Sequence, residues 1–228
     1  PGTLPEGMVY VGGADNMVLG DPLFQESVER VSIQPFYLDR TEVTNSQYAR
    51  FLAAMDATDR ARVVPRRLLP GPGDRTDPLW VATEDGSWDY PSGTGDEPVT
   101  GISLGDARDY AAWAGKRLPT AEEWELAARG LDARAFPFGN DVDPAACNTA
   151  TGAIAAAASF PRDRSPWGAF DMAGNVAEWV EGGAGALGLI KGGSFELPRY
   201  RAMAASNERR KATLPYADVG FRCARDVN

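Results

Sequence analysis

Residues 114–130 read AGKRLPTAEEWELAARG and contain the start, buried face and end of one short helix. Thr120 and Glu123 have the spacing of a capping box, in which each side chain accepts a hydrogen bond from the other residue's backbone N–H. Gly130 is suited to end the helix. The apolar residues between them repeat at the three-to-four-residue spacing of one helix face: Trp124, Ala127 and Ala128. We therefore expect a short helix between Thr120 and Gly130 that buries an indole.

Two further helices are predicted from the same kind of signal. Thr44 and Gln47 form a second capping box, followed by apolar residues at helical spacing: Tyr48, Phe51, Leu52 and Met55. Another helix begins near Ser103, has Asp106 in its first turn and ends before Gly115. Its inward face carries Ala107, Tyr110, Ala111 and Ala114.

The remaining regular structure consists of short strands in a loop-rich chain. Apolar or alternating runs bounded by glycine or proline predict strands at Met8–Val11, Val28–Leu38, Leu189–Lys191 and Gly220–Ala224. Residues 56–97 are rich in Pro, Gly, Asp and Arg and predict a long ordered or partly mobile excursion. The alanine-rich residues 150–158 form either a helix or a spacer. With 25 glycines and 17 prolines, the 228-residue chain fits neither a helical bundle nor a doubly wound sheet.

Composition excludes several classes of function. The net charge of −9 repels phosphate backbones, so we expect no nucleic-acid partner. No apolar run is long enough to span a bilayer, so no membrane insertion is expected. The chain has no histidine, which excludes Ser-His-Asp catalysis and imidazole-bound iron or zinc. Its two cysteines, Cys147 and Cys223, are too few for an all-cysteine metal site.

Six other segments occur in order along the chain around the helix of residues 114–130. They are FYLDRTEVTNSQY (36–48), DEPVTGIS (96–103), FPFGN (136–140), FDMAGNVAEW (170–179), KGGSF (191–195) and GFRCAR (220–225). Together with AGKRLPTAEEWELAARG, this ordered set resembles the formylglycine-generating enzyme family, also called the sulfatase-modifying factor family, from about Met8 to Arg225. The resemblance implies an irregular α+β fold of the C-type-lectin type, with small twisted antiparallel sheets and two or three helices.

The same resemblance bears on catalysis. Enzymes of this family hold copper(I) with a cysteine pair between the GGS and GFR motifs, and soft thiolates suit that ion. Here the corresponding segment, Phe195 to Val219, contains no cysteine. Another branch of the family uses iron held by histidines, and this chain has none. We therefore expect no copper, iron or zinc and no oxidase activity.

The resemblance also implies metal and ligand sites. Asp171, Gly174, Val176 and Glu178 match the family's calcium motif, and carboxylates with a glycine-containing turn suit calcium. In the alternative, Asp171 caps a turn and Glu178 pairs with an arginine. A second calcium site of the family, at Asn148, is expected to be lost.

The family's substrate groove maps to residues 195–216, which mix aromatic rings and guanidinium groups. The expected ligand-binding residues are Trp167, Phe195, Arg199, Tyr200, Arg201, Asn207 and Arg209. In the alternative, this segment is a solvated loop. Arg117 is expected to form a structural ion pair, and Arg222 is expected to tether the core rather than contact a ligand. Cys147 and Cys223 either form one disulfide or remain two free thiols.

We expect one domain, residues 1–228, cut from a longer protein, that binds a protein, peptide or small molecule without catalysis. It could be the sensing part of a bacterial signalling protein such as a serine/threonine kinase. One alternative is the variable protein of a diversity-generating retroelement. Another is a modifying enzyme that uses the acid–base chemistry of nearby carboxylates: Glu196, Glu208 and Asp218. The sequence does not indicate the compartment.

Overall fold

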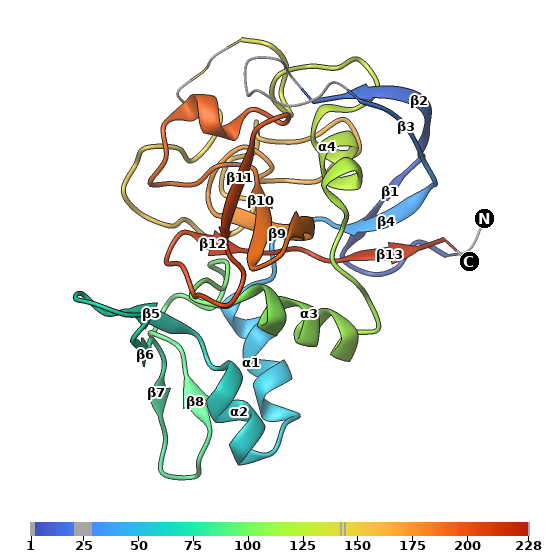
Figure 1. Ribbon diagram of the computed structural model, residues 1–228. Helices are drawn as coiled ribbons and strands as arrows, with labels where there is room; N and C mark the ends of the chain where they lie inside the picture. The colour runs from blue at the N-terminus through green and yellow to red at the C-terminus, as the bar shows by residue number, and fades with distance from the viewer. Residues whose placement is uncertain (1–2, 21–28, 142, 144, 228) are drawn as a thin grey trace.

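The computed structural model describes residues 3–20, 29–141, 143 and 145–227, and two small sheets organise them. The first has the order β1–β4–β13, formed by Met8–Val11, Phe36–Asp39 and Ala224–Asp226. The second has the order β11–β10–β9–β12, formed by Asn207–Lys211, Leu187–Lys191, Ala177–Ala184 and Val219–Gly220. Residues 219–226 therefore add an edge strand to both sheets (Figure 1).

The three predicted helices are confirmed with their caps. They are α1 (Asn45–Ala53), α3 (Leu104–Trp113) and α4 (Ala121–Arg129). Thr44, Ser103 and Thr120 each form the N-cap with both hydrogen bonds of a capping box. These caps satisfy backbone N–H groups that the first helical turn leaves without partners.

The predicted strands are confirmed in part. The run from Val28 to Leu38 is divided at Pro35 into β3 (Glu29–Ile33) and β4, and β3 pairs with β2 (Ala14–Leu19). Val28 itself lies outside the described residues. Gly220–Ala224 is not one continuous strand, because residues 221–223 connect β12 in the four-stranded sheet to β13 in the three-stranded sheet. The pairing of β12 with β9 is parallel, whereas we expected only antiparallel sheets.

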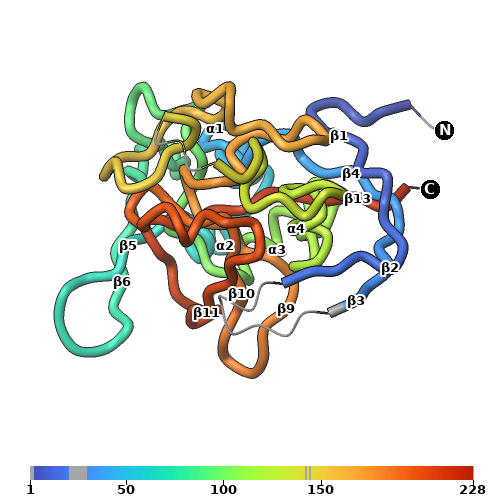
Figure 2. Tube along the Cα trace, turned by 90° about the horizontal axis from the view of Figure 1, so that it is seen from above, coloured from blue at the N-terminus to red at the C-terminus, as the bar shows by residue number. Residues whose placement is uncertain are grey.

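The excursion at residues 56–97 contains regular structure that the sequence did not indicate. It forms α2 (Ala57–Val63) and two hairpins, which pair β5 (Arg66–Leu68) with β6 (Thr76–Pro78) and β7 (Val81–Ala82) with β8 (Trp88–Asp89). Asp56 caps α2 by accepting hydrogen bonds from two backbone N–H groups. The β5–β6 hairpin extends away from the body of the molecule (Figure 2). Residues 150–158 form turns and loop, so the spacer alternative was right.

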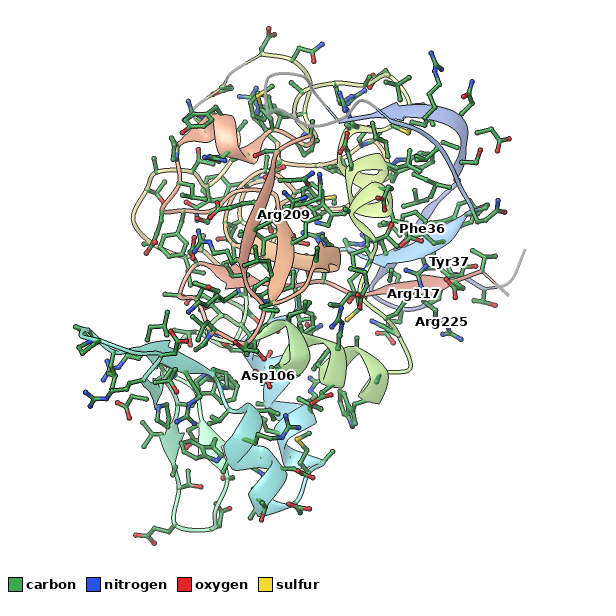
Figure 3. The ribbon with its side chains drawn as sticks, in the orientation of Figure 1. Phe36, Tyr37, Asp106, Arg117, Arg209 and Arg225 are labelled. Carbon is green, nitrogen blue, oxygen red and sulfur yellow. The ribbon has the colours of Figure 1, made fainter. Side chains whose placement is uncertain are left out.

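Two large apolar clusters hold the fold together. One joins α1 and α3 to the four-stranded sheet through buried aromatic residues: Tyr48, Phe51, Trp179 and Phe221. The other joins α4 to the three-stranded sheet through Trp124, Phe36 and Leu38. Arg225 lies on β13, the edge strand of this sheet, and Arg117 lies beside that strand (Figure 3). Among the described residues, no helix is long and apolar enough to cross a membrane.

Candidate functional site

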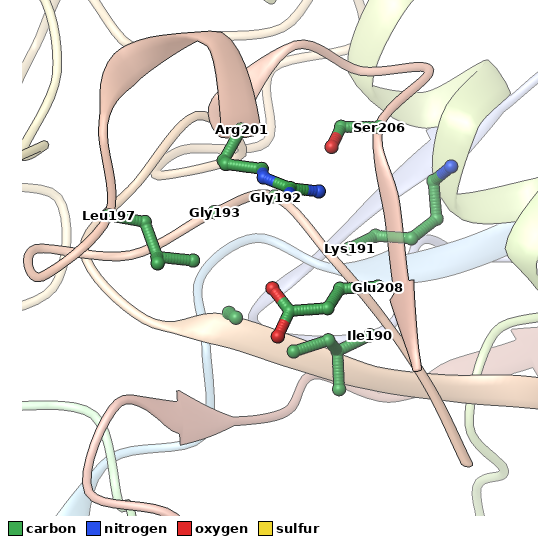
Figure 4. A pocket seen from close by; sticks show the side chains of 9 residues that line it. Ile190, Lys191, Gly192, Gly193, Leu197, Arg201, Ser206 and Glu208 are labelled. Carbon is green, nitrogen blue, oxygen red and sulfur yellow. The ribbon is translucent and has the colours of Figure 1, made fainter. Parts of the chain in front are cut away.

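A shallow pocket of about 200 Å³, including its open mouth, lies where β10 runs into the Gly192–Gly193 turn. Strand β9 contributes Ala177, β10 contributes Ile190 and Lys191, and β11 contributes Glu208. The loop after β10 and the 3₁₀ turn η2 (Arg199–Ala202) close the other side. The remaining lining residues are Gly192, Gly193, Leu197, Arg201 and Ser206 (Figure 4).

The two glycines allow the chain to form this pocket. Gly193 has φ +66°, and a Cβ there would lie 2.8 Å from the backbone nitrogen of Ala202 in η2. Gly192 has φ +93°, and a Cβ there would lie 3.0 Å from the indole of Trp124 on α4. Since glycine adopts positive φ without steric cost, the pair lets η2 and α4 approach the same turn. The approach of η2 brings Arg201 to the pocket.

Strand pairing determines which residues of β10 and β11 meet at the pocket. Ile190 is directly opposite Glu208, and Lys191 is directly opposite Asn207. Because successive side chains point to opposite faces of a sheet, these two pairs lie on opposite faces. In Figure 4 the Glu208 carboxylate points into the pocket, whereas the Lys191 side chain extends away toward α4.

Glu208 is held in place by a chain of polar contacts. Arg210 Nε donates to Glu208 Oε1 at 2.6 Å, and Arg210 Nη1 lies 3.3 Å from Asp218 Oδ1. The Arg210 guanidinium also lies over the ring of Tyr216, 4.9 Å from its centroid. Ser194 Oγ donates to the other oxygen of Asp218 at 3.0 Å. Glu208 therefore has one oxygen fixed by Arg210 and its carboxylate directed into the pocket.

Lys191 is a structural cation rather than a ligand contact. Its Nζ lies 2.7 Å from Asn207 Oδ1 and 3.2 Å from Glu125 Oε2, and the side chain is almost completely buried. Glu125 in turn accepts a hydrogen bond at 2.7 Å from Arg129 on α4. This buried network ties β10 and β11 to α4 behind the pocket. Our sequence reasoning missed Lys191, although it is the first residue of the KGGSF motif.

The seven expected ligand-binding residues do not come together in one site. Arg201 lines the pocket. Asn207 accepts from Lys191 on the other face of the sheet, and Arg209 is exposed on β11 (Figure 3). Trp167 packs against the second apolar cluster and donates through Nε1 to the carbonyl oxygen of Leu126 at 3.1 Å. The pocket therefore contains one of the seven.

Phe195, Arg199 and Tyr200 lie near the pocket in sequence but not among its lining residues. Phe195 is buried, and Tyr200 is 56% exposed with the Arg201 guanidinium 5.5 Å from its ring centroid. The Nε of Arg199 is buried and has no hydrogen-bond partner in the part of the chain that the structure describes. Of the candidate acid–base groups, Glu208 lines the pocket, Asp218 is buried beside Arg210, and Glu196 is exposed.

A second polar feature, the buried carboxylate cluster, consists of Glu42, Asp163, Asp171 and Glu178 around Arg222. Glu178 and Arg222 are both fully buried, and Arg222 donates to Glu178 through Nε at 2.7 Å and Nη2 at 2.6 Å. Trp124 Nε1 also donates to Glu178 Oε2 at 2.7 Å. Arg222 is therefore a core tether, as expected, and Glu178 has the arginine partner that the alternative to calcium binding required. Arg117 likewise pairs with Glu123 and Asp226.

The cluster carries more negative than positive charge. Burial raises the pKa of Glu42 well above its usual value, and the neighbouring Asp171 carboxylate raises it further. Burial and Asp171 do the same to the pKa of Asp163. Glu42 Oε2 and Asp163 Oδ1 are buried and have no hydrogen-bond partner among the described residues. Four buried carboxylates against one guanidinium must be compensated by bound protons or by a cation.

The expected calcium residues fit this requirement in charge and donor type. Asp171 is buried in the cluster, and one of its oxygens accepts from the backbone N–H of Ala158. Glu178 is already engaged by Trp124 and Arg222, so backbone carbonyl oxygens of Gly174 and Val176 would have to complete the set. Within the described ranges, no three Asp, Glu or Cys side chains are arranged to hold a metal ion. A cation here would therefore depend on backbone oxygens, which calcium accepts readily.

Cys147 and Cys223 are two free, buried thiols, so the disulfide that we considered is not formed. The physical reason is that the two residues belong to different parts of the core. Cys223 packs in the first apolar cluster, whereas Cys147 packs with Phe136 in a small third cluster. Burial raises the pKa of both thiols. Neither cysteine lines the pocket.

Comparison with known proteins gives matches over almost the whole chain. Residues 3–227 match the Sulfatase-modifying factor enzyme 1-like domain. The chain is 33% identical to the formylglycine-generating enzyme of Thermomonospora curvata, over 99% of this chain and 95% of that protein. It is 30% identical to the inactive C-alpha-formylglycine-generating enzyme 2 of Bos taurus, over 86% of this chain and 79% of that protein.

Further matches show how widely this fold is used. The serine/threonine-protein kinase pkn1 of Chlamydia pneumoniae is 28% identical over 88% of this chain, which spans 34% of the kinase. The solved structure of PvdO from Pseudomonas aeruginosa aligns with a TM-score of 0.75 and 23% identity, covering 96% of this chain and 94% of that one. Treponema denticola variable protein 1 aligns with a TM-score of 0.66 and 15% identity, covering 96% and 95%. These two structures confirm the loop-rich fold.

Proposed function

This chain belongs to the family of the Sulfatase-modifying factor enzyme 1-like domain, and from that premise we propose that it is a non-catalytic ligand-binding domain whose site is the pocket beside Gly192–Gly193. The observation that carries the proposal is the pocket's chemistry. Residues 195–219 hold no cysteine, and the pocket is lined by glycines, aliphatic groups, Arg201 and Glu208. Such groups bind and orient a ligand but provide no thiolate for copper.

A role in signalling is consistent with the relatives. One of them is a kinase of which this chain spans about a third, and another is named as an inactive enzyme. We propose that this chain likewise serves as a recognition unit in a signalling protein. In that role the intact capping boxes, apolar clusters and buried ion pair preserve the scaffold while the loop after Gly193 determines what binds.

Filling the pocket should separate binding from folding. We expect Leu197→Trp to reduce the affinity for any small molecule that binds there at least tenfold, because the indole occupies the space beside Ile190 and Gly193. Ligand-observed NMR with a collection of small metabolites identifies binders, and titration gives their affinities. Leu187→Trp is the matched control, because Leu187 lies on the same sheet, in β10, and is 41% exposed outside the pocket.

Two results would contradict the proposed function. The first is affinity that is unchanged in the Leu197→Trp variant for every binder. The second is conversion of a cysteine-containing peptide to an aldehyde when the protein is supplied with copper(I) and oxygen. The aldehyde is detected by hydrazide labelling and mass spectrometry.

We also propose that a calcium ion offsets part of the charge of the buried carboxylate cluster, with Asp171, Glu178 and the carbonyl oxygens of Gly174 and Val176 as its ligands. Calcium at about 100 times its Kd would add about 2.7 kcal/mol to the free energy of unfolding. That raises the melting temperature by about 5–10 °C in a domain of this size. Asp171→Asn should abolish the shift, and Asp77→Asn, at an exposed ion pair, should keep it. A melting temperature insensitive to calcium and to chelator, with no metal by elemental analysis, would rule out the site.

A further inference from the structure

Arg201 places a positive charge at the pocket, and the described residues supply no matching negative partner. Within the described part of the chain, no carboxylate lies within ion-pair distance of its guanidinium, whose contact is the ring of Tyr200. By contrast, Arg210 on the neighbouring strand is fully engaged by Glu208 and Asp218. The Arg201 side chain is half-buried and lies over Gly192 (Figure 4). A guanidinium in this setting offers two parallel N–H donors to a carboxylate.

Glu208 places a negative charge on the opposite side of the same pocket. Its Oε1 accepts from Arg210, while Oε2 has no hydrogen-bond partner among the residues that the structure describes. The carboxylate is directed into the pocket from β11, across from Arg201 (Figure 4). No ion pair joins Glu208 to Arg201 in the described chain, so a gap remains between the two charges. An ammonium group is the natural partner for the free oxygen of Glu208.

The rest of the pocket limits the size and polarity of a ligand. Ile190, Leu197 and Ala177 give the pocket an aliphatic lining, and Ser206 offers a hydroxyl. The volume of about 200 Å³ includes the open mouth of the pocket, so it is an upper limit for a ligand, which would remain partly exposed to solvent. This space suits a ligand of a few heavy atoms with a short aliphatic group. A nucleotide or an oligosaccharide is much larger.

From this arrangement we propose that the pocket binds a small zwitterion of the α-amino-acid type, its carboxylate against Arg201 and its ammonium group against Glu208. The inference rests on the proposed function, since it names the ligand class of the same pocket. Each charge of such a ligand meets an opposite charge already present on the protein. A simple carboxylate or a simple amine would satisfy one side and leave the other without a partner.

The test compares one zwitterion with its two halves. Alanine is titrated into the protein in low-salt buffer and followed by chemical-shift changes of the Gly192 and Gly193 amides. Propionate and ethylammonium are titrated in parallel. We expect alanine to bind at least tenfold more tightly than either half. Added salt should weaken alanine binding, because both contacts are charged and partly exposed to water.

Substitutions at the two charged side chains identify their partners. Arg201→Gln should reduce alanine affinity at least tenfold and leave ethylammonium binding unchanged. Glu208→Gln should reduce alanine affinity similarly and leave propionate binding unchanged. Arg209→Gln is the matched control, because Arg209 lies between Glu208 and Arg210 on β11 but is exposed and does not line the pocket. Circular dichroism and the melting temperature verify that each variant is folded.

The outcomes separate this inference from the proposed function. If none of the three probes binds at millimolar concentration, or if propionate or ethylammonium binds as well as alanine, the zwitterion inference is wrong. The proposed function still stands in that case if another small molecule binds and loses affinity in Leu197→Trp. An alanine affinity that is equal in wild type, Arg201→Gln and Glu208→Gln also overturns the inference.

Discussion

Arg222→Met is expected to lower the free energy of unfolding by about 3–5 kcal/mol, the cost of leaving a buried charge without its partner. Glu178 and Arg222 are both 0% exposed, and the guanidinium also donates to the carbonyl oxygen of Phe170 at 2.9 Å. Methionine fills much of the same volume but supplies neither the charge nor the donors. The buried carboxylate cluster would then contain four acidic groups and no guanidinium.

Urea unfolding monitored by tryptophan fluorescence measures this effect. Arg108→Met is the matched control, because Arg108 forms a two-point contact with Glu181 at side-chain exposures of 48% and 36%. We expect Arg108→Met to lower the free energy of unfolding by at most about 1 kcal/mol, as is usual for the loss of an exposed ion pair. The double variant Glu178→Gln/Arg222→Met should cost less than the sum of its single variants. Similar losses for Arg222→Met and Arg108→Met would show that the buried pair has no special role.

Gly174→Ala is the second substitution with a large expected effect. It should lower the free energy of unfolding by about 2–6 kcal/mol, through two contributions. Gly174 has φ +114°, and a Cβ would lie 2.4 Å from the backbone oxygen of Asn148. We expect about 1–3 kcal/mol from backbone strain and about 1–3 kcal/mol from overpacking. Because the Gly174 N–H also donates to the carbonyl oxygen of Gly192 at 2.8 Å, the damage should extend to the pocket.

Gly185→Ala separates these two contributions. Gly185 also has a positive φ, +62°, but lies in the exposed turn between β9 and β10, where an added Cβ would have no atom within 4 Å. Gly185→Ala should lower the free energy of unfolding only by the cost of backbone strain, about 1–2 kcal/mol. Denaturant midpoints of the two variants make the comparison. Equal losses would mean that the close approach of Asn148 to Gly174 has no energetic consequence.

Much of the fold could be predicted from local signals in the sequence. The helices after Thr44, Ser103 and Thr120 were predicted correctly because their caps and apolar faces lie within one short stretch. Strand β9 and the parallel contact of β12 with β9 were not predicted. The pairing of β12 with β9 joins residues about 40 positions apart, such as Ala177 and Val219, and no local pattern encodes it. Helix α2 was missed because it is short and buries only Val63 among its residues.

The candidate site was predictable only in part. The sequence directed attention to the segment after the KGGSF motif, and one of the residues it singled out there, Arg201, lines the pocket. It did not show that Asn207 and Glu208 would face opposite sides of the sheet, since the alternation of β11 has meaning only once its register with β10 is known. Arg222 of the GFR motif was expected to tether the core rather than contact a ligand, and its buried hydrogen bonds to Glu178 and to the carbonyl oxygen of Phe170 agree with that expectation.

The position of residues 219–226 has a consequence for biosynthesis. Strands β12 and β13 complete the two main sheets, and Arg222 between them reaches the carboxylates contributed by much earlier segments. During translation, therefore, neither sheet can be completed and the buried ion pair cannot form until this segment has left the ribosome. Such late, non-local closure slows folding and leaves apolar surface open on the nascent chain. We expect the growing polypeptide to need chaperone protection for longer than a helical bundle of equal length.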